Sequence, residues 1–333
     1  MARKKILALP EGDIFLKRDI EILKKHFEIR TAPTFNRKKP ITSIPSIFKI
    51  LRGTLWADLT FSQFADTHAF LAVLVSKMFR KKSIVIVGGY EVAKVPEIGY
   101  GAMLNPVFAQ VVKFVLNHAD RILTTTESLK EDAINNAKVN GKNIKTVPEC
   151  YDAEFWKNCK DKEDLVITVA HIRDSVVKRK GLETFVKAAK YLPRIKFILV
   201  GPHIDGSVNC LKSIAPSNVE FPGFIPETEL PKWYSRAKVY CQLSRYEGIP
   251  NALCEAMLCE CVPVGTEYCG IPLAMGDTGF YVPYGDVEAT VQAIKKALNC
   301  DKGKEARERI KNTFPLEKRE RELVMEIEEL LEA

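Results

Sequence analysis

The stretch KVYCQLSRYEGIPNALCEAML, residues 238–258, places an apolar segment, a tight turn and a second apolar segment in direct succession. It predicts a buried strand near 238–244, a Gly-x-Pro turn at 248–250 and a helix from Asn251 onward. Asn251 precedes the first apolar residues of that helix, so we expect its side chain to accept backbone N–H bonds as the N-cap. A strand that leads through a turn into a helix is the building unit of α/β folds.

Two glutamates, Glu247 and Glu255, lie eight positions apart in this stretch. Glu247 precedes the predicted turn, and Glu255 falls in or just after the first helical turn, among residues that are apolar on all sides. In one interpretation Glu255 only stabilises the helix N-terminus through the dipole. In the other, the two carboxylates accept hydroxyls of a polyol while the open helix N–H groups attract its phosphate.

Short apolar runs alternate with amphipathic stretches along the chain, which is typical of parallel sheets covered by helices. In the first half this pattern predicts strands near 4–9, 27–32, 57–62, 83–88, 121–126 and 144–148. In the second half it predicts strands near 165–171, 196–201, 219–224, 238–244, 262–266 and 279–282. We therefore expect two Rossmann-like, doubly wound domains facing across a cleft, with ligands at the carboxyl ends of the strands.

A polar stretch, 150–164, separates the two sets of strands and predicts the domain boundary. The expected organisation is an N-terminal domain over 1–155, a C-terminal domain over 156–314 and a charged amphipathic helix over 315–333. The apolar side chains of that last helix are available to pack back on the N-terminal domain.

The chain of 333 residues has a formal charge of +8, and its basic excess lies in the first half. Residues 1–150 hold 24 Lys and Arg against 14 Asp and Glu, whereas residues 151–333 hold 26 against 28. A basic face of this kind suits an anionic partner, either membrane headgroups or nucleic acid. No apolar run is long enough to span a membrane or to act as a secretory signal.

The nine cysteines are scattered through apolar segments without the dense, even framework of a small secreted domain. This usage indicates a reducing, cytoplasmic environment. Cys254, Cys259 and Cys261 lie close together, but the spacing of the last two is wrong for a zinc knuckle. We expect buried thiols and no metal.

One basic cluster follows the predicted strand near 165–171: Arg173, then Lys178-Arg179-Lys180-Gly181. A glycine and several cations in a strand-to-helix loop can hold a diphosphate, because the loop donates N–H groups and the side chains neutralise charge. Taken alone, a solvated basic loop is the simpler interpretation. The position of the cluster in the same domain as the glutamate pair favours the diphosphate interpretation.

From Val166 to Leu298 the chain resembles the nucleotide-sugar-binding domain of family 4 retaining glycosyltransferases, which have the two-Rossmann GT-B fold. The matching pieces occur in the family's order: KG at 180–181, FILVG at 197–201, VEFPGF at 219–224, EGIPNALCEAM at 247–257, VPV at 262–264 and DTGF at 277–280. The first half matches less well, with agreement at DRIL, 120–123, and at VPECYD, 147–152.

The resemblance implies a donor site formed by Arg173, Lys180, Phe224, Ile225, Glu247, Gly248, Ile249, Pro250, Asn251, Ala252 and Glu255. In it, Glu247 contacts hydroxyls of the transferred sugar, Glu255 holds the ribose and Lys180 binds the diphosphate and helps it to leave. Phe224 and Ile225 lie beside the base. Arg173 is the second cation, a role for which Lys178 and Arg179 compete because the loop spacing differs from the family's.

The fourth strand is followed by Gly88, Gly89, Tyr90 and Glu91, where the family has a sugar-contacting histidine. A double glycine after a buried strand indicates either a loop that a ligand approaches closely or an ordinary turn. We retain these four residues as a candidate acceptor-side loop.

The resemblance implies a retaining transfer of sugar from a nucleoside diphosphate sugar to an acceptor hydroxyl, with Lys180 and Glu247 as the catalytic residues and neither metal nor cofactor. The acceptor, a lipid-linked molecule or a glycan, is not specified, and neither are the sugar and the base. The alternatives are another GT-B enzyme, such as an epimerase, and a non-catalytic basic protein that binds anionic lipid or nucleic acid. No nucleic-acid-binding module is present, so we do not expect that partner.

The basic first half is compatible with peripheral attachment to the inner face of a membrane. Arg37, Lys38 and Lys39 precede a stripe of apolar residues at helical spacing, namely Ile41, Ile44, Phe48, Leu51 and Leu55. Such a stripe is more often the inner face of a packed helix, and that is the interpretation we favour.

Overall fold

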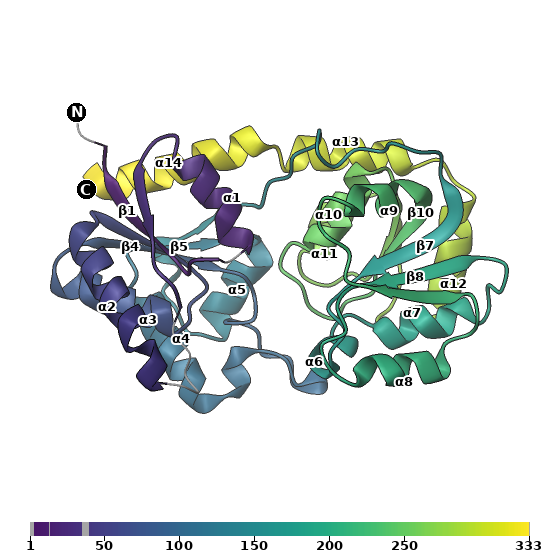
Figure 1. Ribbon diagram of the computed structural model, residues 1–333, viewed down its shortest axis with the longest axis horizontal. Helices are drawn as coiled ribbons and strands as arrows, with labels where there is room; N and C mark the ends of the chain where they lie inside the picture. The colour runs from purple at the N-terminus through teal and green to yellow at the C-terminus, as the bar shows by residue number, and fades with distance from the viewer. Residues whose placement is uncertain (1–2, 13, 35–39, 333) are drawn as a thin grey trace. The chain divides into compact units, whose positions relative to one another are not determined.

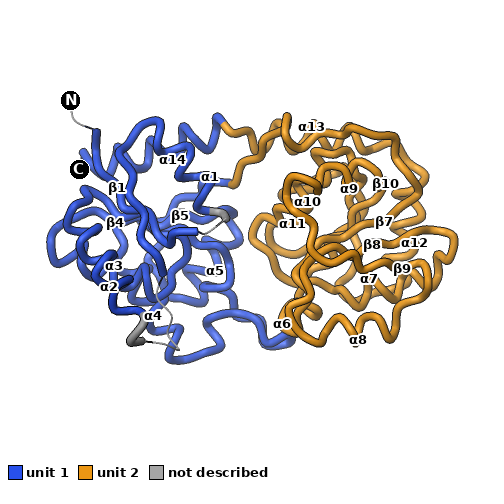
Figure 2. Tube along the Cα trace, in the orientation of Figure 1, with its two compact units in different colours: residues 1–148, 317–333 blue, residues 149–316 orange. Residues whose placement is uncertain are grey.

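The computed structural model describes residues 3–12, 14–34 and 40–332, so the basic triplet at 37–39 lies outside the described residues. The chain divides into two compact units (Figure 2): unit 1 comprises Met1–Pro148 and Glu317–Ala333, and unit 2 comprises Glu149–Leu316. The boundary therefore precedes the expected one. The short segment that follows it belongs to unit 2, because the backbone N–H of Tyr151 donates to Phe314 O at 3.1 Å and Trp156 is fully buried in the core of that unit.

Unit 1 is built on a parallel sheet whose strands are β1 (Lys5–Leu9), β2 (Glu28–Thr31), β3 (Leu59–Gln63), β4 (Lys82–Val87), β5 (Arg121–Thr124) and β6 (Ile144–Thr146). Their order across the sheet is β2-β1-β3-β4-β5-β6. Its α-helices are α1 (Ile14–Leu23), α2 (Pro40–Trp56), α3 (Thr67–Met78), α4 (Pro106–His118), α5 (Glu127–Asn135) and, from the C-terminus, α14 (Leu316–Glu332).

Both faces of this sheet are covered by helices, as Figure 1 shows. Successive residues of a strand point to opposite faces, and β1 follows this rule. Ile6 and Ala8 pack in a core cluster with residues of α1 and α14, whereas Leu7 and Leu9 pack with residues of α2 and α3. Burial on both faces explains why this strand is apolar along its whole length.

The C-terminal helix α14 is an integral part of unit 1. Leu323, Ile327 and Leu330 lie in the same core cluster as β1. Arg319 forms a buried two-pronged pair with Asp19, from Nε to Oδ1 at 2.6 Å and from Nη2 to Oδ2 at 2.7 Å. With α14 included, unit 1 holds 27 Lys and Arg against 20 Asp and Glu, so the helix reduces the basic excess of the first half.

Helix α2 exposes the apolar stripe that we expected to be its inner face. Ile44, Phe48 and Leu55 are 49%, 59% and 46% exposed, so the inner-face interpretation is wrong for these three residues. The buried face contains Ile50 and small residues such as Gly53, where an added Cβ would come within 2.7 Å of the Leu7 side chain. The helix packs on the sheet through Ile50 and small residues, and Ile44, Phe48 and Leu55 are left outside.

Unit 2 repeats the architecture with parallel strands β7 (Glu163–Val169), β8 (Lys196–Val200), β9 (Val219–Gly223), β10 (Ala237–Gln242), β11 (Val262–Gly265) and β12 (Phe280–Tyr281). Its α-helices are α6 (Asp174–Val177), α7 (Leu182–Ala189), α8 (Ser207–Ile214), α9 (Leu230–Arg236), α10 (Asn251–Leu258), α11 (Ile271–Met275), α12 (Val287–Leu298) and α13 (Gly303–Thr313). One core cluster joins the sheet to α7, α8 and α12, and another joins it to α9, α10, α11 and α13.

The strand order of unit 2 is β12-β11-β10-β7-β8-β9, which is the Rossmann order. The chain direction across the sheet reverses between β7 and β10, which are hydrogen-bonded neighbours. Doubly wound sheets bind ligands at the carboxyl ends of the strands at such a switch point. The loops that follow β7 and β10 are therefore the place to look for a site.

Candidate active site

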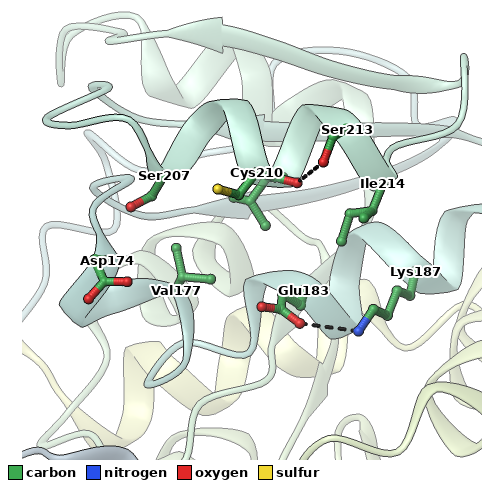
Figure 3. Close-up of a pocket in the computed structure, with 9 residues that line it drawn as sticks. Asp174, Val177, Glu183, Lys187, Ser207, Cys210, Ser213 and Ile214 are labelled. Atoms are coloured by element: carbon green, nitrogen blue, oxygen red, sulfur yellow. Dashed lines mark hydrogen bonds and ion pairs between the residues drawn. The ribbon is translucent and has the colours of Figure 1, made fainter.

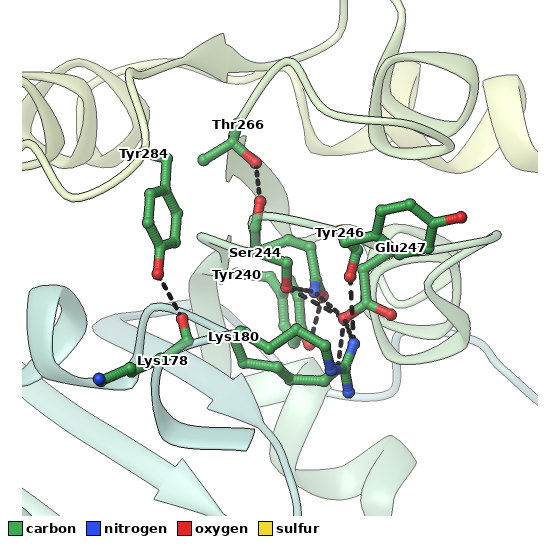
Figure 4. A network of polar contacts seen from close by, with 10 residues as sticks. Lys178, Lys180, Tyr240, Ser244, Tyr246, Glu247, Thr266 and Tyr284 are labelled. Carbon is green, nitrogen blue, oxygen red and sulfur yellow. Dashed lines mark hydrogen bonds and ion pairs between the residues drawn. The ribbon is translucent and has the colours of Figure 1, made fainter. Parts of the chain in front are cut away.

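The loops after β7 and β10 bring the predicted cation cluster and the first predicted glutamate together (Figure 4). Glu247 Oε1 lies 2.8 Å from Arg179 Nη1 and 3.2 Å from Lys180 Nζ. The same oxygen accepts hydrogen bonds from Ser244 Oγ at 3.0 Å and from Gln242 Nε2 at 3.4 Å. Four donors thus converge on Oε1, while Oε2 has no hydrogen-bond or ion-pair partner among the described residues.

The two cations beside Glu247 determine the protonation state of its carboxylate. Burial by itself would raise the pKa of Glu247, but Arg179 and Lys180 outweigh it and lower the pKa to about 2. Burial lowers the pKa of Lys180 from its usual value, and the charge of Arg179 acts in the same direction, against the attraction of Glu247. Glu247 is therefore a firmly ionised carboxylate, and an acid role for it is excluded near neutral pH.

The cation loop between α6 and α7 is held in place by its backbone. Gly181 has φ +61°, and a Cβ there would come within 2.3 Å of Leu243 O, so glycine lets the loop lie directly against the end of β10. The backbone N–H of Arg245 donates to Arg179 O at 2.8 Å, and Tyr284 Oη donates to Lys178 O at 2.6 Å. The side chain of Lys178 points away from Glu247 in Figure 4, so of the three competing cations it is Arg179 that joins Lys180 at this carboxylate.

The predicted N-cap role of Asn251 is wrong. Pro250, with ψ 100°, takes the cap position, and α10 begins at Asn251 without a side-chain cap bond. Asn251 Oδ1 instead accepts a hydrogen bond from Tyr151 Oη at 2.6 Å. A proline can precede a helix because its missing N–H is not needed there, and it leaves the Asn251 side chain free for a tertiary contact.

Four backbone N–H groups in this turn have no acceptor within the described part of the chain: those of Gly248, Ile249, Asn251 and Ala252. They lie directly beside Glu247 in the sequence and lead into the positive end of α10. Gly270 packs against the other side of the turn, where an added Cβ would come within 1.7 Å of Gly248 O. The turn is thus fixed in place while its amides stay open, an arrangement suited to an anion.

The second predicted glutamate, Glu255, lies after the first turn of α10 and is 9% exposed. Tyr234 Oη donates to Glu255 Oε2 at 3.4 Å. Glu255 is therefore too deep in the helix for the dipole of its first turn to be the main reason for a carboxylate at this position.

The remaining predicted donor residues are more exposed. Arg173 takes the cap position of α6 and is exposed, and Phe224 is 67% exposed. Ile225 is half-buried against the core of unit 2. These residues follow β7 and β9 at the same carboxyl edge of the sheet as the Glu247 cluster.

In unit 1 the double glycine after β4 is closed by its own chain. Glu91 is 3% exposed, and its carboxylate accepts from the backbone N–H groups of Ala65, Gly88 and Gly89 at 3.0–3.3 Å. Burial raises the pKa of Glu91, against these hydrogen bonds. Tyr90 points outward, 48% exposed. A ligand that approached the two glycine amides would have to displace Glu91.

A separate cavity of about 390 Å³ lies among α6, α7 and α8 of unit 2 (Figure 3). Its lining includes Asp174, Cys210 and the exposed ion pair of Lys187 with Glu183, and none of the Glu247 cluster. Cys254, Cys259 and Cys261 are buried free thiols. Within the described ranges, no group of three or more His, Cys, Asp or Glu side chains is arranged to hold a metal ion.

Three contributors to the site escaped the sequence analysis: Gln242, Ser244 and Tyr284. Gln242 and Ser244 could have been predicted from the sequence, because polar residues at alternate positions near the end of a buried strand lie on the same face. Tyr284 could not, since the contact of its hydroxyl with residue 178 joins positions 106 apart.

Comparison with known proteins shows which class of protein this chain resembles. Residues 152–314, which lie within unit 2, match the family model described as glycosyl transferases group 1. Among curated proteins, the chain is 21% identical over 197 residues to the phosphatidylinositol N-acetylglucosaminyltransferase component from Arabidopsis thaliana, covering 57% of this chain and 44% of that protein. It is 24% identical over 226 residues to alpha-galactosylglucosyldiacylglycerol synthase of Streptococcus pneumoniae, covering 61% of this chain and 59% of that protein. The chain thus spans less than two thirds of each of these relatives.

Solved structures match the whole chain. Anabaena Alr3699/HepE in complex with UDP and glucose has a TM-score of 0.81 at 15% identity and covers 98% of this chain and 99% of its own. Sucrose-phosphate synthase from Thermosynechococcus elongatus has a TM-score of 0.79 at 19% identity, with the same coverage. The predicted fold class, GT-B with two Rossmann-like domains, is confirmed.

Proposed function

We propose that the protein is a family 4 retaining glycosyltransferase, which moves a sugar from a nucleoside diphosphate sugar to an acceptor hydroxyl. The observation that carries the proposal is the Glu247 cluster at the switch point of unit 2. An ionised carboxylate with one oxygen held by two cations and the other unpartnered lies beside four open amides. Such a site offers an acceptor for a sugar hydroxyl and donors for a diphosphate in one place.

In this proposal each group has a defined task. Glu247 Oε2 accepts a hydroxyl of the transferred sugar, and Glu255 holds the ribose. Lys180, with Arg179 beside it, neutralises the charge that develops on the departing diphosphate, which makes a metal unnecessary. The acceptor hydroxyl attacks the anomeric carbon from the side of the leaving group as the bond to the diphosphate breaks, and the departing diphosphate takes the hydroxyl proton. The configuration is retained, and Glu247 acts by orienting the sugar.

The acceptor is a lipid-linked or glycan hydroxyl. Support comes from relatives whose names include a phosphatidylinositol-directed transferase, a diacylglycerol glycolipid synthase and an O-antigen chain mannosyltransferase. No helix in the described residues is long and apolar enough to cross a bilayer. We place the protein in the cytoplasm, attached peripherally to the inner face of the membrane through α2, whose exposed Ile44, Phe48 and Leu55 are flanked by Lys49 and Arg52.

Thermal unfolding with UDP, GDP and ADP tests the donor site. At a nucleotide concentration 100-fold above Kd, binding stabilises the protein by about 2.7 kcal/mol. We expect one nucleotide to raise Tm in the native protein and in Lys178→Ala, whose side chain points away from the site, and to have little effect in Lys180→Ala. If no nucleotide raises Tm, or if the two lysine variants respond equally, the proposal loses its main support.

Two further measurements check the reaction. NMR of the product should show the anomeric configuration of the donor, and excess EDTA should leave the rate unchanged. Inversion of the configuration, or loss of activity that Mg²⁺ or Mn²⁺ restores, would contradict the retaining or the metal-independent part of the proposal.

A further inference from the structure

The turn that ends α3 combines exposed apolar side chains with unpaired cations. Met78 and Phe79 are 69% and 53% exposed, although large apolar side chains are normally buried. Their neighbours in the sequence are Lys77, Arg80 and Lys81. Exposed apolar side chains grouped with cations are a feature of surfaces that bind another molecule.

A pocket of about 260 Å³ lies at this turn, lined by Lys77, Arg80, Lys81, Lys82, His118 and Asp120. None of its four Lys and Arg side chains has an ion pair with a described residue, whereas lysines elsewhere in the chain, such as Lys187 and Lys232, have glutamate partners. The carboxylate in the lining is engaged elsewhere, since Asp120 Oδ2 accepts from the backbone N–H and the hydroxyl of Ser83. Asp120 offsets one of the four charges in the lining, so the pocket keeps a net positive charge that an anion would reduce.

The backbone gives Arg80 no structural reason to be arginine. Arg80 has φ +52°, and its backbone N–H donates to Lys77 O at 3.4 Å. The backbone N–H of Lys81 donates to Ser76 O at 2.8 Å. These two bonds form a Schellman helix end, in which the left-handed position favours glycine. A non-glycine residue there costs about 1–2 kcal/mol of conformational energy. The geometry of this turn therefore does not require the guanidinium of Arg80.

The pocket lies at the opposite edge of the sheet from the loop of Glu91. Lys82 is the first residue of β4 and Asp120 directly precedes β5, so both mark the amino ends of strands. The double glycine of residues 88 and 89 follows the carboxyl end of β4. The cation pocket is thus separate from the edge at which a doubly wound sheet normally holds its substrate.

We propose that this pocket binds the phosphate of an anionic membrane lipid, with Met78 and Phe79 entering the interfacial region beside it. The charges would suit any phosphate, but a soluble phosphate gives no use for two exposed apolar side chains. Apolar insertion next to cations is the combination that holds proteins at anionic bilayers. This inference rests on the membrane part of the proposed function and does not depend on glycosyl transfer.

The test is co-sedimentation with vesicles of equal parts phosphatidylglycerol and phosphatidylcholine, compared with vesicles of phosphatidylcholine alone. In Arg80→Gly the charge is lost while the turn gains its preferred residue, so the fold is kept. We expect the partition constant to fall about fivefold, the effect of removing one cation from an anionic surface. The matched control is Lys138→Gly, an exposed cation with φ +58° in the same unit, for which we expect a change of less than about twofold.

Two further arms complete the experiment. Met78→Ser with Phe79→Ser should weaken binding to the mixed vesicles at high salt, where apolar insertion remains while electrostatic attraction is screened. Inorganic phosphate is the soluble probe, read by thermal shift in the native protein and in Arg80→Gly. Equal losses in Arg80→Gly and Lys138→Gly would overturn the pocket and leave only a diffuse charge effect. If inorganic phosphate raises Tm but the protein does not bind the vesicles, the assignment of a lipid ligand is overturned. If a nucleotide raises Tm in that same protein, the glycosyltransferase proposal still stands.

Discussion

Glu247 should make unit 2 sensitive to acid. Its ordinary pKa of 4.5 falls to about 2 in the folded protein, and the side chain is 12% exposed. Because the folded-state pKa is depressed, the contribution is fully present above the unfolded value and is lost as the pH falls toward the folded value. The difference corresponds to about 3 kcal/mol at neutral pH. Of this, roughly 1.4 kcal/mol should be lost between neutral pH and about pH 3.5.

Urea unfolding of the parent and of Glu247→Gln measures this loss. Trp156 is fully buried in unit 2, and with Trp233 it reports that unit alone once Trp56 of unit 1 is replaced by phenylalanine. The glutamine variant should be less stable at neutral pH, because two cations lose their partner. It should also lose roughly 1.4 kcal/mol less than the parent on acidification.

The control is Glu183→Gln, in which the carboxylate removed is about half exposed and paired with Lys187. This variant should follow the parent across the pH range, since exposed pairs contribute little. The reasoning is refuted if Glu247→Gln and the parent lose the same free energy of unfolding between the two pH values. It is also refuted if the Glu183 variant flattens the profile as strongly.

Two other predictions concern packing. Asp19→Asn should lower the free energy of unfolding of unit 1 by about 3–5 kcal/mol in urea, because it leaves the buried guanidinium of Arg319 without its counterion. Lys25→Gln breaks an exposed pair with Glu320, the neighbour of Arg319 on α14, and should lower it by less than about 1 kcal/mol. A smaller loss in the first variant would mean that the pair is not buried in solution. Gly270→Ala should abolish the nucleotide-induced rise in Tm, because its Cβ would collide with the turn after Glu247, whereas Gly206→Ala meets open space and should respond like the parent. Equal responses of the two alanine variants would show that the turn does not form the nucleotide site.

Most of the strands were readable because they are short apolar runs bounded by turn residues, whereas the strand β2, with the sequence EIRT, is mostly polar and exposed. All twelve predicted strands occur within a few residues of their expected positions. Burial on both faces of the sheets produces this signal, and it does not depend on distant contacts. The face of a helix was harder to assign. In α2 the packing surface uses Gly53 and Thr54, whose hydroxyl donates to Ile50 O at 2.8 Å, so hydrophobic spacing pointed to the wrong side.

The candidate site was predictable where its residues are close in sequence and not where the fold joins distant ones. Glu247 and Lys180 were predicted, but the choice of Arg179 over its neighbours depends on Gly181 and on the backbone of Arg245, which a loop pattern does not reveal. The failure of Asn251 as a cap has a similar origin. Its amide oxygen binds a tyrosine hydroxyl 100 positions away, a contact that local capping rules do not consider.

The return of α14 to unit 1 has a consequence for the order in which the chain can fold during synthesis. Unit 2 is one continuous segment, so its core can close once residue 316 has left the ribosome. Unit 1 begins first but cannot finish, because Leu323, Ile327 and Leu330 fill part of its core and Arg319 neutralises a buried Asp19. The part of the chain that is made first can therefore complete its core only after α14 has been made.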